Sequence, residues 1–224
     1  MEYLVYAPQT LTSDFAQQLV RQQAEKGIAC LAVGEDVFQN LASKDNPQGI
    51  MAVVRQPRLK LEDLSVASFQ WGVALVAPQD PGNIGSILRT IDAVGASGLL
   101  VLDDPDSNQY SADPFHPNSV RASMGAIFWY PVVTAVFSNF VRWVRLNGFH
   151  VYGTSAHSSL DYLHFEGYDR PLILLMGSER EGLTPDQSAP CDEMLGIPMR
   201  GRVTSLNLAI ATGVMLYSIL GKLR

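Results

Sequence analysis

Apolar residues follow two spacings along most of the chain. Residues 73–76, 98–102, 149–152 and 172–176 form short apolar runs that have the length of buried strands. Between the first two runs, Ile84, Leu88 and Ile91 recur at helical spacing. Short apolar strands that alternate with helices are typical of a largely parallel sheet covered on both faces. We therefore predict an α/β fold with a mostly parallel sheet and helices on both of its faces.

A smaller unit precedes this pattern. Residues 3–6, 28–33 and 50–54 are predicted strands, and residues 11–25 are a predicted helix capped by Thr12 or Ser13. Residues 56–70 are polar and unpatterned, which is typical of a connecting segment.

These boundaries predict three parts. Residues 1–57 form a small α/β module, residues 58–70 a linker, and residues 71–224 the main domain. A module of fewer than ~60 residues has a marginal core by itself.

Charge limits the partners of the protein. The chain has 16 basic and 22 acidic residues, which gives a net charge of −6. Bulk charge therefore cannot hold a polyanion, and contact with nucleic acid needs a local basic patch. Arginine, whose planar fork suits phosphate, outnumbers lysine among the basic residues.

Metal-ligand spacing is absent from the sequence. Cys30 and Cys191 are far apart, and the four histidines show no ligand pattern. His157 follows residues 153–155 and could line a pocket, but a surface loop is the favoured position. Asp103, Asp104 and Asp106 favour a solvated turn over a metal clamp. We expect no metal.

Neither a membrane span nor a signal peptide is visible. The most apolar segment, residues 206–220, is shorter than the ~20 residues that a span needs. The amino-terminal residues carry no basic region before an apolar run. We expect a soluble, cytoplasmic protein.

The first segment with candidate chemistry, residues 77–98, opens a helix after a buried strand. Asn83 is the predicted N-cap, and Gly82 and Gly85 permit close approach of a ligand to the backbone. Arg89 falls on the polar side of the helix. A capped helix with a solvated arginine explains the segment equally well. The glycine spacing does not match a dinucleotide-binding loop.

In the second segment, residues 172–183, an apolar strand runs into Gly177 and Glu179. Open α/β sheets bind ligands at such carboxyl ends. The alternative is a turn in which Gly177 only permits a positive φ. Ser178 lacks the flanking glycines of a nucleophile elbow.

The third segment, residues 195–220, places Arg200 and Arg202 before an apolar helix that Asn207 opens. An unpaired buried amide costs ~1–3 kcal/mol. Asn207 therefore needs a polar partner, either within the core or in a site.

Taken together, the segments resemble the SpoU (TrmH-type) RNA ribose 2′-O-methyltransferases of the SPOUT class. The family motifs appear in order as DPGNIGSILRTIDAVG from Asp80, LMGSEREGL from Leu175 and IPMRGRVTSLNLAIATG from Ile197. SVRASMGAIFWYPV from Ser119 resembles a connecting segment, with Arg121 where the family has lysine. The resemblance covers residues 71–220. The module over residues 1–57 resembles the latter part of the family's substrate-binding domain, without the opening strand and helix expected before Tyr3.

The resemblance implies a fold and a site. It implies a carboxyl-terminal trefoil knot, bound S-adenosylmethionine, an RNA substrate, and a homodimer whose site is completed across the interface. The implied cofactor-binding residues are Thr154, Gly177, Ile197, Met199, Ser205 and Leu206. The implied catalytic residues are Asn83, Arg89, Glu179, Ser205 and Asn207. The implied RNA-binding residues are Arg89, Arg121, Arg180, Arg200 and Arg202.

The hypothesis is an S-adenosylmethionine-dependent methyltransferase that acts on a ribose 2′-hydroxyl of 23S ribosomal RNA. Transfer RNA is the second substrate choice. A non-catalytic RNA-binding or ribosome-assembly protein on the same fold is an alternative. A nucleotide-dependent oxidoreductase lacks its glycine fingerprint.

Overall fold

The computed structural model describes residues 1–42 and 46–223. The chain divides into two compact units, Met1–Pro57 and a larger one that begins at Arg58.

The first unit is a small sheet with two helices. In its described residues, β1 (Tyr3–Tyr6) pairs parallel with β2 (Ala29–Ala32) and antiparallel with β3 (Ile50–Val53). The helices are α1 (Asp14–Glu25), which Ser13 caps, and α2 (Glu35–Ala42), which the sequence did not predict. The three predicted strands are confirmed, with ends trimmed by up to one residue.

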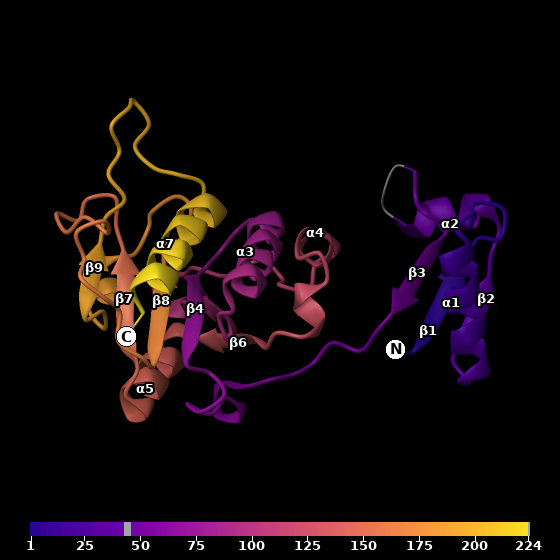
Figure 1. Cartoon of the computed structure of the whole chain (residues 1–224), viewed down its shortest axis with the longest axis horizontal. Helices are drawn as coiled ribbons and strands as arrows, with labels where there is room; N and C mark the ends of the chain where they lie inside the picture. Colours follow the sequence, from indigo (N-terminus) through magenta and orange to yellow (C-terminus); the bar gives the residue numbers. More distant parts are fainter. Residues whose placement is uncertain (43–45, 224) are drawn as a thin grey trace. The chain divides into compact units, whose positions relative to one another are not determined.

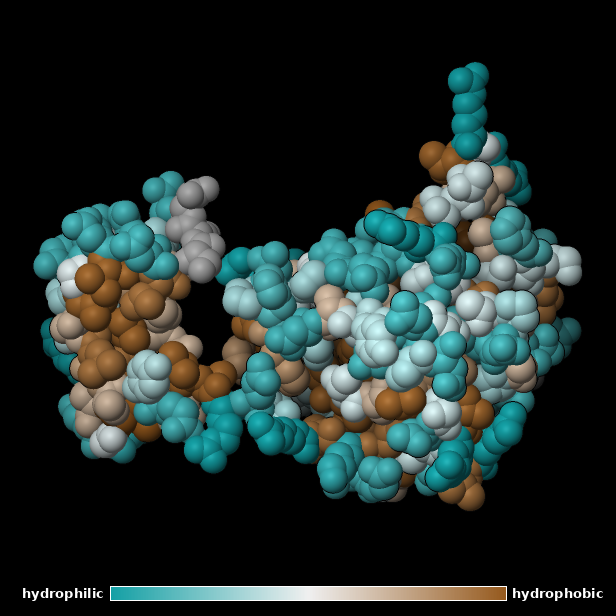
Figure 2. Space-filling model, turned by 180° about the vertical axis from the view of Figure 1, so that it is seen from behind, coloured by the Kyte–Doolittle hydropathy of each residue, from teal (hydrophilic) through white to brown (hydrophobic). Residues whose placement is uncertain are grey.

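The core of this unit is small. Val5, Ala7 and Phe38 form its buried cluster, whereas Leu31 on β2 and Leu41 on α2 are exposed to solvent. Figure 2 shows apolar side chains at the surface of this unit. So small a core agrees with the marginal stability expected of a short module.

A parallel sheet forms the centre of the second unit (Figure 1). Over the described residues it has six strands in the order β6-β5-β4-β8-β7-β9, and every pairing is parallel. The prediction of a mostly parallel sheet is confirmed. The strands are β4 (Trp71–Val76), β5 (Gly98–Asp103), β6 (Val132–Val136), β7 (His150–Thr154), β8 (Leu172–Met176) and β9 (Glu193–Leu195).

Helices cover both faces of this sheet. α3 (Pro81–Val94), α4 (Pro117–Ala122) and α7 (Leu208–Lys222) lie on the face to which Val73 contributes, and α5 (Phe137–Asn147) lies on the face to which Ala74 contributes. Neighbouring residues of β4 enter opposite clusters because strand side chains alternate. The remaining helical turns are α6 (Pro185–Ser188), η1 (Leu61–Asp63), η2 (Pro105–Ser107) and η3 (Ala126–Phe128).

Two local expectations differ from the structure. The segment expected as a linker buries Leu61 and Phe69 in the cluster beneath α5, so it is part of the second unit. The N-cap of α3 is Asp80, whose Oδ1 accepts a hydrogen bond from Gly82 N at 2.7 Å, and not Asn83. Pro81 suits the first position of a helix, so α3 begins earlier and Asn83 lies within its first turn.

Among the residues that the structure describes, no helix is long and apolar enough to cross a membrane.

Candidate active site

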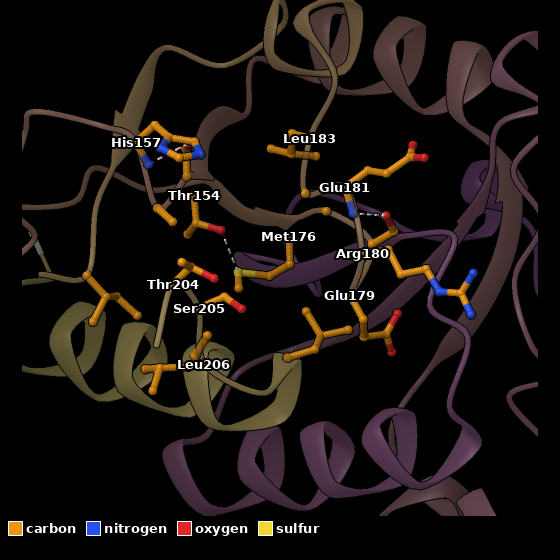
Figure 3. A pocket seen from close by; sticks show the side chains of 18 of the residues that line it. Thr154, His157, Met176, Glu179, Arg180, Glu181, Leu183, Thr204, Ser205 and Leu206 are labelled. Atoms are coloured by element: carbon orange, nitrogen blue, oxygen red, sulfur yellow. Dashed lines mark hydrogen bonds between the residues drawn. The ribbon is translucent and has the colours of Figure 1, made fainter. Parts of the chain in front are cut away.

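A pocket of about 320 Å³ opens where β7, β8 and β9 end (Figure 3). Its walls are the segments that follow these three strands, together with the beginning of α7. The pocket lies at the carboxyl ends of parallel strands, where open α/β sheets bind ligands. It is lined by all six residues that the resemblance assigns to the cofactor: Thr154, Gly177, Ile197, Met199, Ser205 and Leu206.

A tight turn after β8 forms one wall. Gly182 N donates to the carbonyl oxygen of Ser178 at 3.0 Å, which folds the chain back on itself. A Cβ atom on Gly177 would lie 2.0 Å from the carbonyl carbon of Gly182. Only glycine fits at position 177, because the close neighbour is backbone that a side chain cannot displace. The requirement at Gly177 is therefore close approach and not a positive φ.

The rest of the lining combines apolar and polar groups. Leu195, Ile197 and Leu208 supply apolar surface, and Thr154 Oγ1 lies 3.3 Å from Met176 Sδ. Small-molecule sites of ~300–1,000 Å³ are commonly built in this way, with apolar walls and a few polar groups that fix orientation.

Three of the predicted catalytic residues form one hydrogen-bonded row beside the pocket. Asn207 Nδ2 donates to Asn83 Oδ1 at 3.0 Å, and Asn83 Nδ2 donates to Glu179 Oε1 at 3.1 Å. The Glu179 carboxylate also accepts from the backbone N–H groups of Gln79 and Asp80 at 3.1–3.4 Å. The row joins residues from three distant segments of the sequence, and it supplies the polar partner that the sequence analysis expects for Asn207.

Asn207 also begins the last helix. Its Oδ1 accepts from Ala209 N at 2.9 Å and from Ile210 N at 3.3 Å, which makes it the N-cap of α7. Both ends of its amide group are therefore used, one for the helix and one for the row.

The other two predicted catalytic residues are placed differently. Ser205 lines the pocket, two residues before Asn207. Arg89 is exposed on α3, nearly two helical turns beyond Asn83, and is not among the described residues that line the pocket.

The predicted RNA-binding arginines are spread over several segments, and only some are near the pocket. Arg180 lines it. Arg200 and Arg202 are on the loop between two lining residues, Met199 and Thr204. Arg121 is on α4, where it donates to Asn118 Oδ1.

Some residues around the site lie in surroundings that differ from those predicted from the sequence. His157 is exposed, as the favoured surface-loop position requires, and it also lines the pocket, which was the alternative. Asp104, expected in a solvated turn, is only 6% exposed, and its carboxylate accepts a hydrogen bond from the buried Gln187. Only Gln187 had a local signal, since Thr184 and Gln187 have the spacing of a capping box.

Among the described residues, no cluster of three or more histidine, cysteine, aspartate or glutamate side chains is suited to hold a metal ion.

Comparison with known families assigns both parts of the chain. The sequence model of the SpoU rRNA Methylase family matches residues 70–217. A second model, RNA 2′-O ribose methyltransferase substrate binding, matches residues 5–60.

Individual relatives are similar over nearly the whole chain. The 23S rRNA (uridine(2479)-2′-O)-methyltransferase of Streptomyces viridochromogenes is 35% identical over 96% of this chain and 74% of its own length. The 23S rRNA (guanosine(2553)-2′-O)-methyltransferase RlmP of Bacillus subtilis is 30% identical over 88% of this chain and 75% of its own. The crystal structure of an AdoMet-bound rRNA methyltransferase from Sinorhizobium meliloti matches with a TM-score of 0.84 and 36% identity, over 97% of this chain and 78% of that one.

Proposed function

This chain belongs to the SpoU rRNA methylase family and is an S-adenosylmethionine-dependent RNA ribose 2′-O-methyltransferase, and we propose that its target is a ribose of 23S ribosomal RNA. The observation that supports the target is the similarity over nearly the whole chain to two enzymes named for 23S rRNA. A ribosomal RNA target implies action in the cytoplasm.

The pocket fits S-adenosylmethionine. Its volume of about 320 Å³ suits a ligand of that size, and the glycine turn at Gly177 leaves backbone groups open where a side chain would fill the space. We propose that Thr154, Gly177, Ile197, Met199, Ser205 and Leu206 hold it. When bound, the cofactor supplies a methyl group on a positively charged sulfur, which is transferred to the ribose oxygen as the carbon–sulfur bond breaks.

The residues beside the pocket must orient the ribose and manage its proton. A 2′-hydroxyl is a very weak acid, so the developing negative charge on its oxygen has to be stabilised. Arginine is protonated at all relevant pH values and is a poor general base. We propose that Arg89 binds a phosphate and stabilises the developing oxyanion, while the row of Asn83, Glu179 and Asn207 fixes the wall of the site with Ser205 nearby.

The exposed position of Arg89 supports a site that is completed by a second copy of the chain. α7 carries an exposed apolar stripe at Ile210, Tyr217 and Leu220, whose spacing places them along one side of the helix. We propose that this stripe is buried in a homodimer and that Arg89 contributes to the site across its interface.

RNA contact is proposed for two regions. Arg89, Arg121, Arg180, Arg200 and Arg202 supply local positive charge on a chain whose net charge is −6. The unit Met1–Pro57 is proposed to recognise the substrate, because its residues match the substrate-binding family model.

The experiment is transfer of a tritiated methyl group from S-adenosylmethionine into total RNA from a strain that lacks this protein. We expect label in 23S ribosomal RNA at one linkage that resists alkali, because 2′-O-methylation removes the hydroxyl that attacks the phosphate. Label in transfer RNA instead would contradict the proposed target and favour the second substrate. If the protein is dimeric and no RNA is labelled, the result would favour a non-catalytic RNA-binding protein.

A further inference from the structure

A row of side-chain hydrogen bonds links the loop after β5 to the turn that lines the pocket. Gln187, which is fully buried, donates from Nε2 to Asp104 Oδ2 at 2.6 Å and to Gln109 Oε1 at 3.0 Å. Gln109 Nε2 in turn donates to Glu181 Oε2 at 2.8 Å. Glu181 belongs to the pocket-lining turn from Ser178 to Gly182.

The direction of these hydrogen bonds is fixed from both ends. Asp104 and Glu181 are carboxylates, which accept and cannot donate when ionised. Gln187 Oε1 accepts from Thr184 N at 3.1 Å, which leaves its Nε2 for Asp104 and Gln109. Gln109 must therefore accept from Gln187 and donate to Glu181. Turning over the Gln109 amide would break two hydrogen bonds, and turning over the Gln187 amide would break three.

Further hydrogen bonds hold the end of the row at Asp104. Backbone hydrogen bonds join Asp104 and Gln109 in both directions, at 2.7 and 2.9 Å. The capping box formed by Thr184 and Gln187 fixes the beginning of α6. Figure 3 shows the Glu181 side chain extending to the side of the turn opposite Thr154 and His157. Glu181 thus links the turn to this hydrogen-bonded loop.

We propose that Gln109 and Gln187 are positioning residues for S-adenosylmethionine: through Glu181 they hold the turn at residues 178–182 where the pocket requires it. This inference rests on the proposed function, in which the pocket binds S-adenosylmethionine. Neither glutamine lines the pocket among the described residues, so both act through the turn.

An exchange of donor and acceptor tests the proposal. Gln109→Glu places two carboxylates against each other, and neither can donate. Glu181→Gln alone keeps a hydrogen bond, because Gln109 can still donate to the new amide oxygen. The double variant restores the row, since a carboxylate at position 109 accepts from Gln187 and from an amide at position 181.

Binding of S-adenosylmethionine to the full chain is measured by calorimetry. We expect Gln109→Glu to weaken binding about tenfold or more, Glu181→Gln to weaken it less, and the double variant to return to within about threefold of the original protein. Gln70→Ala is the matched control, because Gln70 also donates to one acceptor, the carbonyl oxygen of Val66, but lies at the opposite end of β4 from the pocket.

Two results would overturn the proposal: unchanged binding by Gln109→Glu, or a double variant that binds as weakly as Gln109→Glu. If thermal unfolding shows that Gln109→Glu does not fold, Gln109→Ala replaces it, and unchanged binding by that variant overturns the proposal equally. Absence of binding by the original protein would overturn the proposed function and this inference together, whereas failure of the exchange alone leaves the proposed function standing.

Discussion

Asn207 serves the helix and the candidate site through opposite ends of one amide. Asn207→Asp keeps the capping oxygen and adds negative charge at a helix N-terminus, which is favourable. It removes the Nδ2 donor to Asn83 and so breaks the row. We expect a smaller fall in melting temperature than a lost cap would cause, and a loss of methyl transfer of about tenfold, the cost of one lost hydrogen bond.

Asn207→Ala is the comparison for this prediction. It loses the cap as well, so the free energy of unfolding should fall by about 1 kcal/mol in addition to the loss of activity. If Asn207→Asp transfers methyl groups as fast as the original protein, the row has no catalytic role.

The catalytic role proposed for Arg89 is not explained by the contacts that it makes within one copy of the chain. Because it is exposed and outside the pocket, Arg89→Ala should leave folding and S-adenosylmethionine binding nearly unchanged. Methyl transfer should be abolished, because the oxyanion loses its stabilising charge. Arg142→Ala, on α5 at the opposite face of the sheet, is the control. Equal loss of binding and transfer would contradict the role proposed for Arg89.

Cys191 has an unusual pKa. Burial, with a smaller contribution from Asp192, raises its pKa to about 12. The thiolate is the reactive form, so at pH 8 iodoacetamide should label Cys191 slowly in the folded protein and quickly in urea. Labelling at equal rates would show that the thiol is not buried.

The raised pKa of Cys191 also makes the stability of the fold depend on pH. As pH rises, the unfolded chain loses the Cys191 proton first, near the ordinary pKa of 9.0, so stability is fully present below that pH. It is lost progressively between about pH 9 and pH 12. Cys191→Ala should flatten the fall in melting temperature over this range.

Among the helices, α3 and α4 touch through a glycine. A Cβ atom on Gly85 would lie 2.2 Å from the carbonyl oxygen of Ser119 and 2.7 Å from Ala122 Cβ. Gly85→Ala should therefore push α4 away and lower the free energy of unfolding in urea by about 1–3 kcal/mol.

Gly221→Ala is the control, and its expected effect on the free energy of unfolding has the opposite sign. Gly221 is in α7, and a Cβ atom there meets nothing within 4 Å. Alanine favours a helix over glycine by up to ~1 kcal/mol, so this variant should be stabilised. Equal effects of the two substitutions would mean that the contact of α3 with α4 adds nothing to the stability of the fold.

The elements that the sequence predicted well are those with strong periodicity. The apolar strand over residues 172–176 is found with unchanged bounds as β8, and the stripe from Ile84 to Ile91 lies on α3. The helix α2 and the edge strand β9 were not predicted, because short elements give little periodic signal.

The residues of the candidate site also divide into those that belong to a sequence pattern and those that do not. Motif residues such as Gly177 and Asn207 were found because they stand in long family patterns. The contact between Asp104 and Gln187 was not predicted, because it joins positions 83 residues apart and no local pattern encodes it.

For the assembled protein, the exposed stripe on α7 predicts a dimer. Tyr217→Glu places a charge on the stripe and should convert the dimer to monomers in sedimentation, with loss of methyl transfer. Leu146→Glu, on α5 and 78% exposed, should change neither property. A stable monomer before any substitution would contradict both the dimer and the shared site. The trefoil knot stays a prediction from the family resemblance.

The order in which the pocket walls occur along the chain has a consequence for protein synthesis. The walls come from residues 154–157, 176–183 and 195–211, so the third wall leaves the ribosome last. A nascent chain that has exposed all of β4–β8 still lacks a complete binding surface. Ligand binding stabilises only the state that binds it. S-adenosylmethionine therefore cannot assist the early, co-translational assembly of the sheet, which has to depend on the packing of its apolar strands with the helices already made.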